Sequence, residues 1–111
     1  LAQQVANGNV VFVDVTAEWC ITCQVNKALV IGKGEVYSRL KATGTIAMQA
    51  DWTRPNPVIT QYLSSFGRYG IPFNAVYGPG APDGIALPEL LSQSVVLEAL
   101  DKAGSGAMAL K

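Results

Sequence analysis

The sequence predicts an α/β domain in which helices cover both faces of a mixed β-sheet. Its 111 residues, half of them apolar, suffice for one hydrophobic core and therefore for one domain. Residues 10–15 form a β-branched run that is typical of a buried central strand. Patterns of helix and strand alternate along the chain in the order helix, strand, helix, helix, strand, helix, strand, strand, helix, and no internal repeat is evident.

The central strand and the elements that follow it fill the first half of the chain. Asp14 interrupts the strand as its one acidic residue. Residues 20–31 suit a helix that ends before the glycines at positions 32 and 34. Residues 35–42 carry apolar side chains at helical spacing, and residues 45–50 alternate as a second strand.

A helix start is signalled at Asn56 and Pro57. Asn is a preferred N-cap residue, and Pro is favoured at the first helical position. Apolar side chains then recur on one face as far as Phe66. We therefore expect a helix that ends at Phe66.

The last three elements complete the predicted sheet and its cover. Residues 73–77 are typical of a strand, and a Gly/Pro-rich turn leads from them to an edge strand at residues 85–87. Ser92 or Ser94 can cap a final helix that reaches about Lys102.

The two ends of the chain suggest a domain taken from a longer protein. The sequence opens at Leu1 without a methionine or a signal peptide, which indicates a longer precursor. Residues 104–111 contain Gly and Ser and are typical of a flexible tail or an appended remnant. We therefore expect the folded domain to occupy residues 1–103.

Charge and hydropathy argue against several classes of partner. Eight basic and eight acidic residues cancel, histidine is absent, and the charges are scattered. The chain thus lacks the basic patch that nucleic acid or anionic lipid would require. Its longest apolar runs fall far short of the roughly 18 residues that cross a bilayer. We expect the partners to be proteins or small neutral molecules.

Cys20 and Cys23 form a Cys-x-x-Cys pair at the first turn of the predicted helix. A helix N-terminus carries about half a positive charge and unpaired N–H groups, which stabilise a thiolate. A thiol pKa lowered from its free value of about 8.5 raises the reactive fraction at ambient pH. We therefore assign Cys20 as the nucleophile and Cys23 as the residue that resolves a mixed disulfide.

Other uses of the two cysteines are weaker interpretations. A structural zinc site needs about four ligands, and the chain has two thiols and no histidine. A purely structural disulfide across two residues would close a very small loop and remove little chain entropy. Two buried inert thiols are a third alternative. Trp19 and the strand-to-helix junction argue against it, because they indicate that the pair is displayed at a surface. Redox chemistry is the favoured interpretation.

Several residues form a pattern along nearly the whole chain. Asp14 lies six positions before Cys20, Ala17-Glu18-Trp19 leads into the cysteine pair, and Gly70-Ile71-Pro72 precedes a strand. This pattern resembles thioredoxin. The resemblance implies a thioredoxin fold, with a central mixed β-sheet flanked by helices on both faces.

Four stretches narrow the resemblance, namely residues 16–26, 50–53, 66–72 and 87–91. They resemble the C-terminal periplasmic domain of DsbD-type membrane thiol:disulfide interchange proteins, and among these the ScsB branch. The chain differs from thioredoxin in carrying Ile21-Thr22 where thioredoxin has Gly-Pro, and from strongly oxidising relatives in having no histidine there. It also differs from DsbD relatives around residues 51–53 and 77–87.

The resemblance implies a protein-disulfide reductase in the bacterial periplasm, as a domain of an inner-membrane protein. The electron donor would be the transmembrane domain of the parent protein, and the acceptors would be periplasmic thioredoxin-like or disulfide-bonded proteins. The domain would be monomeric and would need no cofactor or metal besides the redox-active Cys20–Cys23 disulfide. Cytochrome c biogenesis and copper tolerance are the associated processes.

A carboxylate within an apolar strand is costly unless it is neutralised or paired, so we expect a raised pKa for Asp14. By analogy with the family, Asp14 would sit behind Cys23. Our hypothesis is that Asp14, together with Glu18 and through water, accepts or returns the proton of Cys23. The alternative is that Asp14 only hydrogen-bonds nearby backbone or a lysine.

The resemblance also predicts a cis peptide bond between Ile71 and Pro72, a state of only about one X–Pro bond in twenty. Such a turn would offer the backbone of Ile71 to an extended substrate segment. An ordinary trans proline at a strand start is the alternative.

Further contacts with a substrate are assigned around the cysteines. Trp19 would form an exposed apolar rim, Ile21 and Thr22 would border the reactive sulfur, and Tyr69 is a weaker candidate contact. The other large aromatic residues, Trp52, Phe66 and Phe73, are interpreted as core or loop packing.

Two other classes of function stay open at this point. A Cu(I)-binding module could use both thiolates, because Cu(I) prefers soft sulfur ligands. A thioredoxin-fold docking module would bind partners without turnover.

Overall fold

The computed structural model describes residues 8–109 and forms a four-stranded sheet between helical layers. The helix that the sequence placed before the first strand falls on residues outside this range. The elements are β1 (Val10–Thr16), α2 (Ile21–Asn26), η1 (Lys27–Ile31), α3 (Gly34–Leu40), β2 (Thr45–Asp51), α4 (Pro57–Ser65), β3 (Phe73–Gly78), β4 (Ala81–Ala86) and α5 (Gln93–Ala109).

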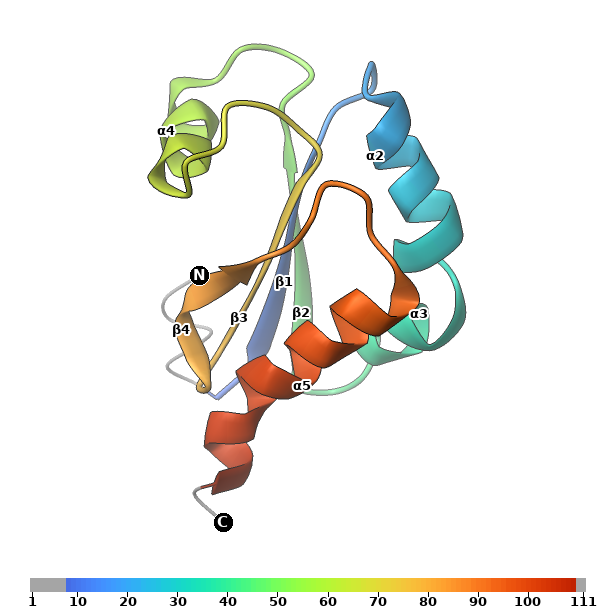
Figure 1. The fold of residues 1–111 in the computed structure, drawn as a ribbon, viewed down its shortest axis with the longest axis vertical. Coiled ribbons are helices and arrows are strands. Elements are labelled where there is room, and N and C mark those ends of the chain that lie inside the picture. Colours follow the sequence, from blue (N-terminus) through green and yellow to red (C-terminus); the bar gives the residue numbers. More distant parts are fainter. Residues whose placement is uncertain (1–7, 110–111) are drawn as a thin grey trace.

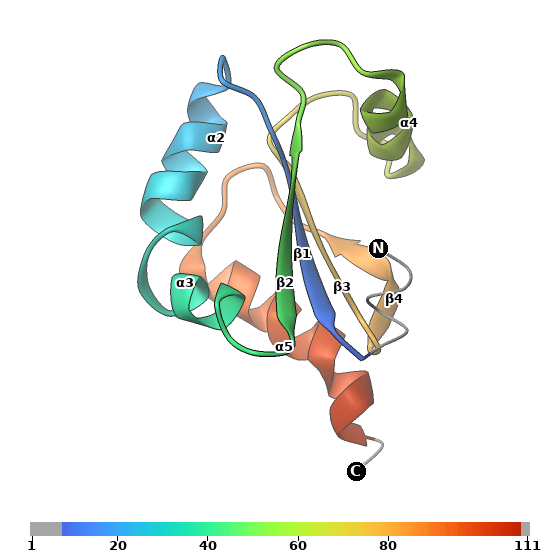
Figure 2. The same cartoon turned by 180° about the vertical axis from the view of Figure 1, so that it is seen from behind.

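The sheet has the strand order β2-β1-β3-β4. β1 is central, parallel to β2 and antiparallel to β3, and β3 pairs with β4 in an antiparallel hairpin. Figures 1 and 2 show α2, α3 and α5 on one face of the sheet and α4 on the other. The predicted mixed sheet with helices on both faces is confirmed.

Side chains of β1 alternate between two hydrophobic clusters, because successive residues of a strand point to opposite faces. Phe12 packs with Val36, Val76 and Leu100 beneath α3 and α5. The neighbouring valines of β1 pack with Leu63 and Phe73 beneath α4. Asp14 points to the same face of the sheet as Phe12, so it lies beneath the helical layer of α2, α3 and α5.

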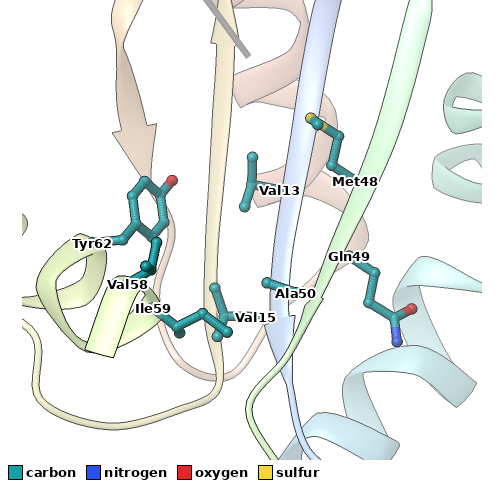
Figure 3. A pocket seen from close by; sticks show the side chains of 8 residues that line it. All are labelled: Val13, Val15, Met48, Gln49, Ala50, Val58, Ile59 and Tyr62. Carbon is teal, nitrogen blue, oxygen red and sulfur yellow. The ribbon is translucent and has the colours of Figure 1, made fainter. Parts of the chain in front are cut away.

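The α4 layer leaves part of its face of the sheet uncovered. A hollow of about 280 Å³ lies between α4 and β2, and its side chains are drawn in Figure 3. The lining is almost wholly apolar and comprises Val13, Val15, Met48, Gln49, Ala50, Val58, Ile59 and Tyr62. No member of the Cys20–Cys23 cluster lines this hollow.

The predicted start of α4 is confirmed in atomic detail. The side-chain oxygen of Asn56 accepts hydrogen bonds from the backbone N–H groups of Val58, at 2.9 Å, and Ile59, at 3.3 Å. Pro57 occupies the first helical position. The helix ends at Ser65, one residue before the predicted end, and Gly67 continues the chain with a positive φ of 73°.

The predicted helix of residues 20–31 divides into α2 and the wider turn η1. The N–H of Gly32 bonds to the carbonyl of Lys27 at 2.8 Å, five residues back, which is the π-helical pattern. Contacts with a residue far along the sequence stabilise the end of η1. The side-chain amide of Gln93 donates to the carbonyls of Leu29, Val30 and Lys33. A residue of α5 thus determines how this helix terminates.

Most of the remaining bounds lie within two residues of the sequence-based expectation, and two elements, β4 and α5, differ by more. β4 spans Ala81–Ala86 rather than 85–87, because Gly78 pairs with Ala81 across the hairpin and the edge position tolerates a proline, which has no N–H to donate. α5 continues past Lys102 to Ala109. Residues 104–109 contain glycine but no proline, and glycine in a helix costs only about 1 kcal/mol relative to alanine.

Candidate functional site

Cys20 and Cys23 form a disulfide at the junction of β1 and α2. Their Cα atoms are 5.2 Å apart. A tight turn connects strand and helix, and the N–H of Cys20 closes it on the carbonyl of Ala17 at 3.2 Å. Cys20 is the N-cap residue of α2, so the pair lies at the first turn as the sequence predicted.

The helix start directs a hydrogen-bond donor at the Cys20 sulfur. The backbone N–H of Cys23 lies 3.2 Å from Cys20 Sγ. In the reduced state, this N–H and the positive end of the helix dipole stabilise a thiolate on Cys20 rather than on Cys23. The local geometry therefore distinguishes the two sulfurs, because the Cys23 N–H is directed at Cys20 Sγ.

The cysteines are less open than the sequence suggested. Cys20 is 6% exposed and Cys23 2%, because both pack with Ala17 and Ile71 in a small cluster. The flanking side chains are open, with Trp19 59% and Ile21 80% exposed. Display at the surface thus holds for the neighbours, whereas Cys20 itself is almost wholly buried.

The proline loop lies against the sulfur cluster. The Ile71–Pro72 peptide bond is cis, as predicted. Ile71 packs on the two cysteines, whereas Tyr69 is 83% exposed. An open groove of about 490 Å³ connects this loop with Trp19, and its walls are Trp19, Trp52, Thr53, Pro55, Tyr69, Gly70 and Ile71.

Of the other predicted contact residues, Thr22 is half-buried in the first turn of α2. Trp52, interpreted as packing, does pack against the cluster beneath α4, and it also lines the groove.

Asp14 is buried, and its partner is Asn74. The side-chain amide of Asn74 donates to Asp14 Oδ1 at 2.9 Å across the β1–β3 pair. Burial raises the pKa of Asp14 above its ordinary value of 3.8, while the Asn74 hydrogen bond and the charge of Lys27 oppose that rise. The carboxyl also lines a hollow of about 370 Å³ with Lys27 and Gln49. The raised pKa is confirmed.

Glu18 is not brought to Asp14. Glu18 is exposed and lines a different groove, with Asp51, Thr53 and Arg54. Within residues 8–109 no hydrogen bond joins Asp14 to either Glu18 or Cys23. The two acids therefore line different hollows, and their joint action on the Cys23 proton stays a prediction.

Two buried asparagines near the site were missed. Asn74 holds Asp14, and Asn26 in α2 donates to Glu89 O at 2.8 Å and accepts from Leu91 N at 3.0 Å. Asn26 therefore ties the helix that carries Cys23 to the loop before α5. The sequence feature that could have identified them is an asparagine within an apolar strand or helix, because a buried amide needs hydrogen-bond partners.

In the part of the chain that the structure describes, no three His, Cys, Asp or Glu side chains are grouped as a metal site would require. None of the helices described there combines the length and hydropathy of a membrane span.

Comparisons with known proteins agree with this geometry. A family model described as thioredoxin-like matches residues 1–79, whereas no curated protein matches the sequence. The C-terminal domain of DsbD from Neisseria meningitidis is similar in its oxidised form, at 22% identity and TM-score 0.68, over 86% of this chain and 80% of that one. Its reduced form gives 23% and 0.67, over 92% and 90%.

A thioredoxin from Thermus thermophilus is 20% identical with a TM-score of 0.67, over 99% of this chain and 85% of that one. At these identities the solved structures establish a shared fold. The family match covers well over half of the sequence and includes both cysteines and the Ile71–Pro72 bond. The chain therefore belongs to the thioredoxin-like family.

Proposed function

We propose that this chain is a thiol:disulfide oxidoreductase domain that reduces disulfides of partner proteins. The observation that carries the proposal is the Cys20–Cys23 disulfide at the start of α2, with the N–H of Cys23 directed at Cys20 Sγ. The cis Ile71–Pro72 bond beside the pair supports it. The groove that leads away from Ile71 supplies a place for the partner's chain.

In the forward reaction the Cys20 thiolate attacks one sulfur of a partner disulfide. That S–S bond breaks, a mixed disulfide forms, and the partner's second sulfur leaves as a thiolate that takes up a proton. Cys23 then loses its proton and attacks Cys20 Sγ. The mixed disulfide breaks, its partner sulfur leaves as a thiolate, and the Cys20–Cys23 disulfide forms. Two electrons have passed to the partner, whose two thiolates take up two protons: one balances the proton lost by Cys23, and the other comes from solvent.

Asp14 is the group that we assign to the proton of Cys23. Burial raises the pKa of Asp14 above its ordinary value of 3.8, which favours the exchange of a proton that a general acid or base requires. Because no direct hydrogen bond joins the two residues in the oxidised state, a water molecule would carry the proton between them. The pH profile of Cys23 alkylation in Asp14→Asn tests this role, and a profile that matches the wild type would exclude it.

We further propose that the domain is a relay in the bacterial periplasm. A dithiol of a membrane domain in the parent protein would reduce the Cys20–Cys23 disulfide, and periplasmic thioredoxin-like or disulfide-bonded proteins would receive the electrons. The likeness to the DsbD C-terminal domain supports this placement. The ScsB branch, cytochrome c biogenesis and copper tolerance rest on the sequence resemblance alone.

The test combines turnover with trapping. The wild-type domain should accelerate the reduction of insulin by dithiothreitol. Cys23→Ser should accumulate mixed disulfides with periplasmic proteins on non-reducing gels, while Cys20→Ser, the matched control, should accumulate none. An inactive wild type with no adduct in Cys23→Ser would refute the proposal. Tight Cu(I) binding without turnover would instead favour the copper module, and full cellular function of Cys20→Ser would favour the docking module.

A further inference from the structure

Two segments about 34 residues apart in sequence meet beside the redox pair. The backbone N–H of Glu18 donates to Thr53 Oγ1 at 3.0 Å, and the indole N–H of Trp19 donates to the carbonyl of Thr53 at 3.0 Å. Glu18 and Trp19 are the two residues directly before Cys20. One residue, Thr53, thus receives a hydrogen bond from each of them.

Thr53 is itself held from the other side. Its N–H and its hydroxyl both donate to Asp51 Oδ1, at 2.9 and 2.5 Å. The N–H of the preceding residue, Trp52, donates to Thr16 O at 2.7 Å. A hydroxyl has one proton to donate. Because the Asp51 carboxylate accepts that proton, the lone pairs of Thr53 Oγ1 are left for the N–H of Glu18.

The turn needs this support at its tip. The turn is closed at its base, where the Cys20 N–H and the side-chain amide of Gln24 both donate to the carbonyl of Ala17. Glu18 and Trp19 stand exposed at the tip of the turn, and within residues 8–109 Thr53 is the hydrogen-bond partner of both the Glu18 N–H and the Trp19 indole. Trp19 is therefore held in place although more than half of its surface is open to solvent.

The position of Trp19 matters because its ring is a wall of the groove beside the disulfide. The opposite walls include Tyr69 and Ile71, and Ile71 packs directly on the two cysteines. Displacing the indole would change the width of this groove without altering the bond from Cys23 N to Cys20 Sγ, which lies within α2 and its cap.

We propose that Thr53 is a positioning residue for disulfide exchange: it holds the Ala17–Cys20 turn and the Trp19 ring in the arrangement that admits a protein partner to Cys20. This inference rests on the proposed function. Thr53 acts through Glu18 and Trp19 and touches neither sulfur. Its loss should therefore weaken the docking of a folded protein more than the chemistry of a small disulfide.

The test uses Thr53→Val, which keeps the side-chain shape and removes the hydroxyl, and Thr53→Ser, which restores the hydroxyl. Thr60→Val is the matched control, since the Thr60 hydroxyl also forms a hydrogen bond, to the carbonyl of Asn56, but lies exposed on α4. Thr53→Val removes the hydroxyl that accepts from the Glu18 N–H and donates to Asp51. We expect this loss to raise KM for insulin about threefold to tenfold. Turnover of hydroxyethyl disulfide should change less than twofold, and Thr53→Ser and Thr60→Val should resemble the wild type.

A spectroscopic readout follows the bond from the Trp19 indole to the backbone carbonyl of Thr53. Thr53→Val keeps this carbonyl but should loosen its position, because the variant loses the hydroxyl bonds to Asp51 and Glu18. Solvent exchange of the Trp19 indole proton, measured by NMR, should accelerate in Thr53→Val, while the indole proton of Trp52, whose nitrogen is buried, should serve as the unchanged reference. Asp51→Ala, a change at an exposed site that frees the Thr53 hydroxyl, should show the same pattern and replaces Thr53→Val if that variant does not fold.

The outcomes separate this inference from the function on which it rests. A wild-type domain that reduces neither insulin nor the small disulfide would overturn both. An active wild type together with a Thr53→Val variant that matches it in KM and in indole exchange would overturn the role of Thr53 alone. Equal losses with both substrates would also overturn it, because they would indicate general damage to the site.

Discussion

Replacing Asn74 with alanine should destabilise the oxidised domain by an amount that depends on pH. Asn74 is 1% exposed, and its amide supplies the hydrogen bond to Asp14 at 2.9 Å. A hydrogen bond to a charged group contributes about 1.5–3 kcal/mol, whereas one to a neutral group contributes about 1 kcal/mol. Asn74→Ala should therefore lower the free energy of unfolding by about 2–3 kcal/mol where Asp14 is ionised, and Tm by about 10 °C.

The sign of the pH dependence follows from Asp14. Its pKa is raised by burial, and the Asn74 bond opposes that rise, so the variant should raise the pKa further. Below pH 3.8, the ordinary value, the carboxyl is neutral in both folded and unfolded chains, and only the neutral hydrogen bond is lost. The unfolded chain ionises identically in both proteins. The penalty of the variant therefore grows as the pH rises through the raised folded-state pKa of the wild type, and it levels off above the still higher pKa of the variant.

Urea unfolding at pH 3.5 and pH 8.5 measures both quantities. The difference in unfolding free energy between wild type and Asn74→Ala should be larger at pH 8.5. The same comparison in an Asp14→Asn background provides the control, since that background has no charge to pair. A loss that is equal at the two pH values, or that keeps its pH dependence in Asp14→Asn, would refute the assignment of Asn74 as the partner of Asp14.

Three further predictions concern packing and charge. Gly78→Ala should cost about 1–3 kcal/mol, because its Cβ would overlap the carbonyl oxygen of Ala103, whereas Gly70→Ala, with no atom within 4 Å of the new Cβ, should change Tm little. Leu63→Ala, at a site 1% exposed beneath α4, should cost about 2–5 kcal/mol in urea unfolding, and a smaller loss would show that the core closes over the cavity. The Thr53 hydrogen bonds lower the pKa of Asp51. The contribution of Asp51 to stability is therefore present above pH 3.8 and is lost as the pH falls through the lowered pKa. Asp51→Asn should reduce the dependence of Tm on pH in that acid range, and an unaltered slope would contradict the contact.

Local features could be predicted because they depend on neighbours along the chain. The cap of Asn56 on α4 and the placement of Cys20 at a helix start each involve residues within three positions of one another. The cis Ile71–Pro72 bond came from the family resemblance rather than from residue chemistry. The raised pKa of Asp14 followed from an acid within an apolar strand, which requires no knowledge of its partner.

The partners themselves were decided by the tertiary structure. Asn74 meets Asp14 across 60 residues because β1 and β3 pair in one register, and a shift of one residue would turn the amide to the other face. Gln93 bonds the end of the helix that carries the cysteines across 60 residues, and Thr53 holds the turn before Cys20 across 35. The cysteine motif and the strand patterns were determined by the sequence alone. The exposure of Cys20, the pairing of its buried acid and the shape of the groove beside it depended on packing, because each requires groups that only the folded chain brings within a hydrogen bond's length.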